Sequence, residues 1–207
     1  MARHVDTRRR AALLEAAATH LVEHGIAHAS LEAIARTAGT SSRMLVHHFG
    51  TRDALVAGAL EIARRRQLDH AEPHFRPGPD AAAVLESAWP WLINAETRRY
   101  FRLFQQVAAL EKLQARSEPS ELHLRLATDW IPMFRALFAA DPRHCDDADA
   151  LAELLLSVYR GLATELLLRP DEAALRSAYE RFIDLLRLRP APRGAGRARR
   201  SPGPADC

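Results

Sequence analysis

Apolar residues recur at helical spacing along most of this 207-residue chain, and no other feature limits its fold as strongly. Leu13, Ala17 and Leu21 fall four residues apart, which predicts one buried face on a helix over residues 8–24. Thr7 is a suitable cap for this helix and Gly25 a suitable stop. Because nine glycines stand against many alanines and leucines, the sequence predicts an all-α protein.

Proline-rich segments divide the predicted helices. Three prolines and a glycine interrupt residues 73–80, which predicts a linker between an N-terminal and a larger C-terminal helical domain. Pro90 should kink or end the helix that follows. Later helices are predicted over residues 96–116, 119–140, 146–168 and 171–188. We therefore expect domains at residues 1–66 and 67–188, followed by a disordered basic tail over 189–207.

Charge is segregated along the chain. Residues 1–66 carry ten arginines and six acidic residues, a net charge of +4. Residues 67–186 carry thirteen basic and nineteen acidic residues (−6), and residues 187–207 carry six arginines and one aspartate (+5). A basic end on an acidic body suggests that this end meets a polyanion, although arginine richness can also follow genome composition. Arg8, Arg9 and Arg10 are either a phosphate-reaching arm or a solvated helix start.

Several protein classes are disfavoured. No apolar run approaches ~18 residues and the N-terminal residues lack the apolar core of a signal peptide, so we expect no membrane span and a cytoplasmic location. Cys145 and Cys207 are too few for a disulfide framework. His70 and His74 lack further ligands, and no glycine-rich phosphate loop or nucleophile elbow occurs. We expect no enzyme activity, cofactor or metal site.

Residues 30–52 carry the functional signal. Ser30 can cap a short helix and Gly39 supplies a tight turn. A second short helix follows from Ser42, and either Thr40 or Ser41 can cap it. This helix-turn-helix arrangement can place its second helix in the major groove of DNA. Leu45 and Phe49, four residues apart, should anchor that helix to the protein.

The same segment resembles the DNA-binding domain of the TetR family of transcriptional regulators. The resemblance rests on the Ile-Ala-x-x-Ala-Gly turn that ends at Gly39, the Leu45-Val-His-His-Phe49 helix and the basic residue Arg52 at the next helix start. With the upstream stretch 11–25 it covers roughly residues 8–66.

The resemblance implies a role for each matching position. Bases would be read by Ser42, Arg43, Met44 and His47, and the DNA backbone would be held by Ser30, Thr40, Ser41, His48 and Arg52. Two positions depart from the family: Val46 replaces the usual tyrosine, which puts one backbone contact in doubt, and Arg43 replaces a residue that is often small. Arginine at this place could add a contact to guanine.

The C-terminal region has two possible uses. Its aromatic residues are either ordinary core or the walls of an apolar effector pocket, for which the candidates are Trp89, Phe101, Phe104, Gln105, Trp130, Met133 and Phe134. Its last two helices are buried within one chain or pair with a second copy. Among closely spaced apolar residues that include Leu154 and Leu185, the interface candidates are Leu151, Leu155, Val158, Leu162, Tyr179, Phe182 and Leu186.

The resemblance thus implies a ligand-responsive regulator. It would bind double-stranded DNA at a palindromic operator as a homodimer, most often as a repressor, and a small-molecule effector would release it. A helical adaptor that binds proteins without DNA is the alternative. Such an adaptor would need neither Ser42 nor Arg43 and would show no salt-dependent binding to duplex DNA.

Overall fold

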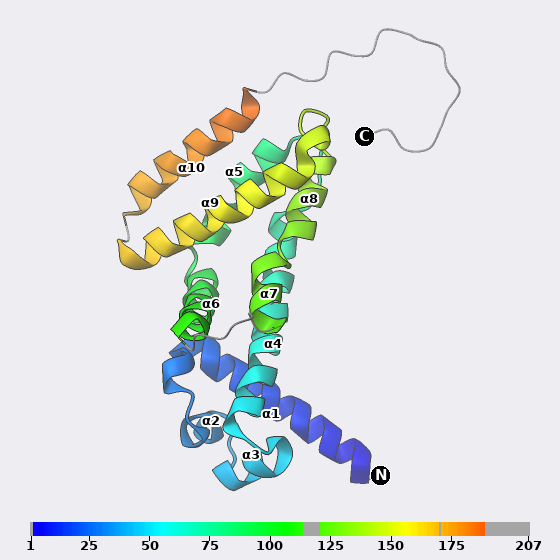
Figure 1. The fold of residues 1–207 in the computed structure, drawn as a ribbon, viewed down its shortest axis with the longest axis vertical. Coiled ribbons are helices and arrows are strands. Elements are labelled where there is room, and N and C mark those ends of the chain that lie inside the picture. Colours follow the sequence, from blue (N-terminus) through cyan, green and yellow to red (C-terminus); the bar gives the residue numbers. More distant parts are fainter. Residues whose placement is uncertain (1, 114–120, 170, 189–207) are drawn as a thin grey trace, which may run out of the picture. The chain divides into compact units, whose positions relative to one another are not determined.

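The computed structural model describes residues 2–113, 121–169 and 171–188, and the fold over these residues is all-α (Figure 1). The described residues fall into two compact units, one within residues 2–70, 95–113 and 121–127, and the other within residues 71–94, 128–169 and 171–188. Within the described residues no helix is long and apolar enough to cross a membrane. The predicted disordered tail at 189–207 lies outside the described residues.

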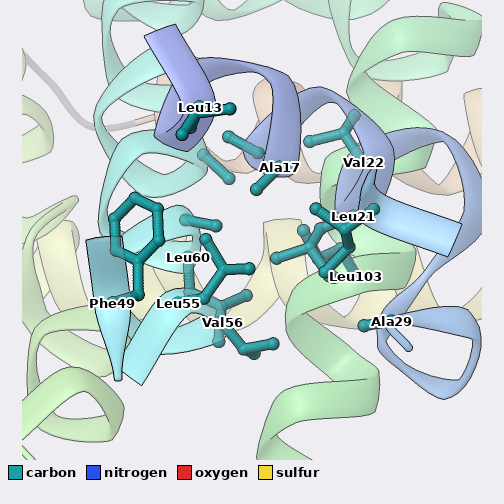
Figure 2. Packing of buried hydrophobic residues seen from close by; sticks show 14 of the residues in the cluster. Leu13, Ala17, Leu21, Val22, Ala29, Phe49, Leu55, Val56, Leu60 and Leu103 are labelled. Atoms are coloured by element: carbon teal, nitrogen blue, oxygen red, sulfur yellow. The ribbon is translucent and has the colours of Figure 1, made fainter. Parts of the chain in front are cut away.

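The first unit contains the N-terminal helices together with two later ones. Its elements are α1 (Ala2–His24), η1 (Ile26–His28), α2 (Leu31–Thr37), α3 (Ser42–Phe49), α4 (Arg52–Ala71), α6 (Ala95–Leu113) and α7 (Glu121–Thr128). Figure 2 shows how side chains of α1, α3, α4 and α6 meet in one core, with Leu21, Leu55 and Leu103 fully buried. Each such leucine contributes roughly 1.5–3 kcal/mol of transfer free energy.

The two packing units do not meet at the domain boundary that the sequence predicted, after residue 66. Helix α6 belongs with the N-terminal helices because Tyr100, Leu103 and Val107 join their core. The functional domain limits stay a prediction, because a packing unit and a functional domain need not coincide.

Helix α1 is longer than predicted. It begins at Ala2, so the predicted cap at Thr7 is wrong, because residues 2–7 contain neither proline nor glycine to stop a helix. The predicted stop is confirmed: Gly25 follows the last helical residue with a φ of 80° and donates its N–H to the Leu21 carbonyl at 2.8 Å.

The second unit surrounds an aromatic core. It contains η2 (Glu72–His74), α5 (Ala81–Ile93), α8 (Ile131–Ala139), η3 (Cys145–Asp147), α9 (Ala148–Leu168) and α10 (Glu172–Arg187). Helix α8 packs along α9, and α10 packs along α5. The ring of Phe75 lies 5.2 Å from those of both Trp91 and Phe134, in edge-on geometry that aromatic pairs favour.

A hydrogen-bonded tyrosine pair crosses the same core. Tyr179 donates its hydroxyl proton to the Leu85 carbonyl at 2.8 Å, so Tyr159 is the donor to Tyr179 across their 2.7 Å separation. Burial raises the pKa of both phenols, which keeps them protonated as donors.

Prolines explain the remaining differences from the predicted helices. Helix α5 continues through Pro90 and ends three residues later at Ile93. The single helix predicted over 119–140 is wrong, because α7 ends at Thr128 and α8 begins at Ile131. Pro132 sits in the first turn of α8, where its missing N–H and fixed φ are tolerated.

A buried carboxylate fastens the turn after α8 to the start of α5. Asp141 accepts the N–H of Ala81 at 2.9 Å and the guanidinium of Arg143 at 2.8 Å, and Arg143 also reaches Asp80 at 2.8 Å. Burial alone would raise the pKa of Asp141, but the hydrogen bonds from Arg143 and Ala81 outweigh it and hold the pKa at about 2.

Candidate nucleic-acid interface

Serine side chains fix the starts of α2 and α3. The hydroxyl of Ser30 accepts the N–H of Ala33 at 3.1 Å, and the hydroxyl of Ser41 accepts the N–H of Met44 at 3.2 Å. Gly39, in the turn between the two helices, has a φ of 59°, which glycine adopts without strain. These contacts confirm the predicted cap at Ser30 and the turn, and of the two candidate caps Thr40 and Ser41 they show that Ser41 caps α3.

Helix α3 turns one face inward and the other to solvent. Leu45 and Phe49 are buried, which confirms the predicted anchors. Arg43, Met44 and His47 are exposed and Ser42 is half-buried, so the proposed base readers lie on the outer side of the helix. The exposed face can therefore approach a groove without disturbing the core.

Cationic and backbone contacts hold α3 in place. The guanidinium of Arg10 lies 4.8 Å from the centre of the Phe49 ring, a cation–π contact that links α1 to the end of α3. Gly50 ends the helix with a φ of 75° and donates its N–H to the Val46 carbonyl at 2.8 Å. Arg10, Arg8 and Arg9 are all exposed, and Arg10 also packs against the Phe49 ring.

The proposed backbone-binding residues frame this helix. Although the hydroxyls of Ser30 and Ser41 accept capping bonds, each can still donate its own proton to a phosphate oxygen. Thr40 is half-buried in the turn, and His48 is half-buried on the flank of α3 beside Phe49. All four lie in or next to the two helices of the motif.

Arg52 has a structural partner that the sequence did not reveal. Its Nε donates to the Ala29 carbonyl at 2.7 Å, and its Nη1 lies 3.0 Å from Asp53. Its side chain therefore joins the start of α4 to the residue before the α2 cap. Part of the guanidinium is still exposed, so a phosphate contact is compatible with this geometry.

His20 is a second residue whose role the sequence analysis missed. It is buried, and its Nε2 donates to the His28 carbonyl at 3.2 Å while its Nδ1 lies 2.8 Å from the Thr37 hydroxyl. The ring thereby joins α1, η1 and α2. A polar residue on an otherwise apolar face of the α1 pattern was the available signal, since buried polar groups need partners.

A groove of about 780 Å³ opens beside this histidine. Its walls include His24, His28, Arg36 and Glu23 from α1, η1 and α2. Over the described residues, no group of three or more His, Cys, Asp or Glu side chains could hold a metal ion.

Helix α6 contacts the end of α1. Arg102 donates to the carbonyl of Glu23 at 2.8 Å and to that of Val22 at 3.4 Å, and Gln106 accepts the N–H of Ile26 at 3.1 Å. These bonds satisfy backbone groups that a helix end leaves without partners. No local pattern marks such contacts, because the partners lie about 80 residues apart in the sequence.

The proposed pocket residues divide between the two units. Phe101, Phe104 and Gln105 are half-buried on α6 in the first unit. In the second unit, Trp89, Trp130 and Phe134 are buried and Met133 is half-buried. The rings of Trp130 and Phe134 lie 5.7 Å apart, and Trp89 lies 5.4 Å from Tyr179. These buried rings pack on one another, and an effector pocket stays a prediction.

The proposed interface residues fall into two groups. Leu155, Leu162, Tyr179 and Leu186 are buried inside the second unit, and their place in a dimer interface stays a prediction. Leu151, Val158 and Phe182 are half-buried. They share a stripe with exposed leucines, Leu154 on α9 at 47% exposure and Leu185 on α10 at 60%.

Comparison with known proteins agrees with this geometry. The family of bacterial regulatory proteins called the tetR family matches residues 13–59. A transcriptional regulator from Rhodococcus sp. Rha1 aligns with a TM-score of 0.65 and 24% identity, covering 87% of this chain and 95% of its own. A TetR-family member from Streptomyces coelicolor A3 aligns with a TM-score of 0.58 and 24% identity, covering 84% and 96%. No curated protein matches the chain. The chain therefore carries the tetR-family N-terminal domain at residues 13–59 and has the fold of that family's transcriptional regulators.

Proposed function

We propose that this protein regulates transcription by binding a palindromic operator as a homodimer, as a repressor that a small-molecule effector releases. The observation that carries the proposal is the outward face of α3, which exposes Arg43 and His47 while Leu45 and Phe49 anchor the helix. A rigid helix that exposes polar side chains on one face fits the width of the major groove. Because transcription occurs where the DNA is, we place the protein in the cytoplasm.

Within this proposal the interface residues divide their tasks. Ser42, Arg43, Met44 and His47 contact base edges, and Arg43 is suited to guanine because its guanidinium can donate two parallel hydrogen bonds. Ser30, Thr40, Ser41, His48 and Arg52 hold the sugar-phosphate backbone and so fix the position of α3. Base contacts give sequence preference, whereas backbone contacts give affinity for any duplex.

Two-fold symmetry would extend the short sequence that one α3 can read. The stripe of Leu151, Leu154 and Val158 on α9 and the stripe of Phe182 and Leu185 on α10 offer apolar surface for a second copy. A dimer formed there would present two recognition helices to half-sites spaced by about one helical turn or a multiple of it.

Release by an effector requires that binding of the effector and binding of the operator weaken each other. A molecule that weakens DNA binding must itself bind less tightly when DNA is present, because the coupling free energy is shared. The aromatic core of the second unit is one candidate for the apolar surface on which such a molecule would depend, and the half-buried face of α6 in the first unit is another.

Selection of bound duplexes from a random pool tests the proposal directly. We expect enrichment of an inverted repeat, and we expect affinity to fall steeply as salt rises, because phosphate contacts release counterions. Absence of binding to any duplex in dilute buffer would reject DNA-dependent regulation and would favour the adaptor hypothesis. Enrichment of a single, asymmetric site would reject the palindrome but keep DNA binding.

A further inference from the structure

The recognition helix exposes an apolar side chain that the core does not need. Val46 is 43% exposed, although α3 is already anchored by the buried pair Leu45 and Phe49. Met44 is exposed to a similar degree, 40%, on another side of the helix. Single exposed apolar residues are common on protein surfaces. Their place on the helix proposed to enter DNA is what makes these two informative.

Val46 lies among the proposed base readers. It follows Ser42 by four residues and Arg43 by three, which makes it their neighbour on the surface of α3. Its carbonyl accepts the N–H of Gly50 at 2.8 Å, so its backbone is fixed at the helix end. A β-branched side chain has few rotamers, and little conformational freedom is lost when it is held against a partner.

The chemistry of valine selects the partner. The side chain has no donor or acceptor, so it can neither bind a phosphate nor read the polar edges of a base. In the major groove, thymine alone among the bases adds an apolar group, its C5 methyl. A methyl group against the valine side chain removes apolar surface of both from water.

We propose that Val46 is a specificity-determining residue that recognises a thymine of the operator half-site through its C5 methyl. This inference rests on the proposed DNA-binding function. Three residues of helix rise about 4.5 Å and one base pair about 3.4 Å. The thymine therefore lies roughly one or two base pairs from the base that Arg43 contacts.

The test removes the methyl from the DNA rather than from the protein. The duplex selected by the wild-type protein is remade with each thymine of one half-site replaced in turn by deoxyuridine, which lacks only that methyl. At one position we expect the dissociation constant to rise about four-fold, as expected for one buried methyl-sized group. The same replacement should change binding by less than about 1.5-fold in Val46→Ala, because the partner group is already gone.

Met44→Ala is the matched control, because Met44 has similar exposure on the same helix. It should keep the full uracil effect at the position assigned to Val46. Since Val46 is exposed, Val46→Ala should leave the thermal unfolding midpoint unchanged.

The possible results distinguish a failure of the Val46 assignment from a failure of the proposed DNA-binding function. If no duplex binds, the proposed function fails and the inference fails with it. If a selected duplex binds but no uracil replacement matters, or if the effect persists in Val46→Ala or vanishes in Met44→Ala, the assignment of Val46 is wrong while DNA binding stands.

Discussion

One side of the Arg52 guanidinium contacts the protein and the other side is exposed to solvent. The bond from Nε to the Ala29 carbonyl fixes the start of α4, while part of the side chain is exposed where a phosphate would lie. Arg43 on the outer face of α3 has no such packing task to perform, because Leu45 and Phe49 anchor the helix. Two arginines that look alike in the sequence thus differ in what their loss would do.

Replacing each arginine with alanine should separate the two tasks. Arg43→Ala should lose ~1–3 kcal/mol of binding free energy on the selected operator and relax preference at one base, without changing stability. Arg52→Ala should weaken binding to all duplexes alike, reduce the salt slope by about one unit and lower the unfolding free energy by ~1–2 kcal/mol. Binding at several salt concentrations and urea unfolding measure these effects. Equal losses on every sequence for both variants would contradict the division.

Asp141 makes stability depend on acid. Its pKa is about 2 in the folded protein, below its ordinary value of 3.8. The ionised carboxylate therefore stabilises the fold fully above about pH 4, by about 2 kcal/mol, and this contribution is lost as the pH falls towards 2. Asp141→Asn should lower stability at neutral pH and flatten its dependence between pH 4 and 2 in urea unfolding.

Asp149→Asn is the control for this experiment, because Asp149 pairs with Arg135 on the exposed surface. A surface pair contributes little, so this change should cost less than ~0.5 kcal/mol and keep the wild-type acid dependence. An unchanged acid dependence in Asp141→Asn would show that the buried carboxylate is not its source.

At the scale of elements, the junction of α1, η1 and α6 depends on one glycine. A β-carbon on Gly25 would lie 2.6 Å from Oε1 of Gln106, the atom that accepts the Ile26 N–H. The positive φ of Gly25 adds strain for any other residue. The helix end and the side chain that caps it are therefore coupled.

A double-mutant cycle tests that coupling. Gly25→Ala should destabilise by ~1–3 kcal/mol through strain and loss of the Gln106 bond, and Gln106→Ala by ~1 kcal/mol. Because both changes lose the same bond, the double variant should cost ~0.5–1 kcal/mol less than the sum. Urea unfolding of the four proteins measures this, and strict additivity would show that the two residues act independently.

At the scale of the whole molecule, the outward apolar stripes of α9 and α10 are the surfaces through which we expect two copies of the chain to pair. The double variant Leu154→Glu, Leu185→Glu places charges on both stripes without entering the core, because both side chains are exposed. We expect a monomer in sedimentation experiments and a loss of about 10²-fold or more in operator affinity, since two half-sites are no longer engaged together. Leu110→Gln, an exposed leucine of the first unit, should change neither. A variant that stays dimeric would locate the interface elsewhere.

Local sequence rules predicted much of the motif and less of the remainder. The cap at Ser30, the glycine turn and the inward pair on α3 depend on residues within one or two turns, so spacing alone identified them. Spacing left Thr40 and Ser41 as equal candidates for the cap of α3, and the structure shows that Ser41 is the cap. The sequence identified the apolar residues of α9 and α10. It did not distinguish those that are buried inside the second unit from those that face outward. Periodicity shows that a face is apolar and does not show what covers it.

What the sequence determined by itself is the helical class, the helix-turn-helix and the residues on the outer face of α3, because hydrogen bonds and side-chain periodicity along one helix are set by near neighbours. The tertiary structure decided which side chains form hydrogen bonds between different elements. The bonds of Arg52 to Ala29, of His20 to His28 and Thr37, and of Arg102 and Gln106 to the end of α1 join residues from different elements. Such contacts exist only once the elements have packed, since burial is what requires each polar group to find a partner.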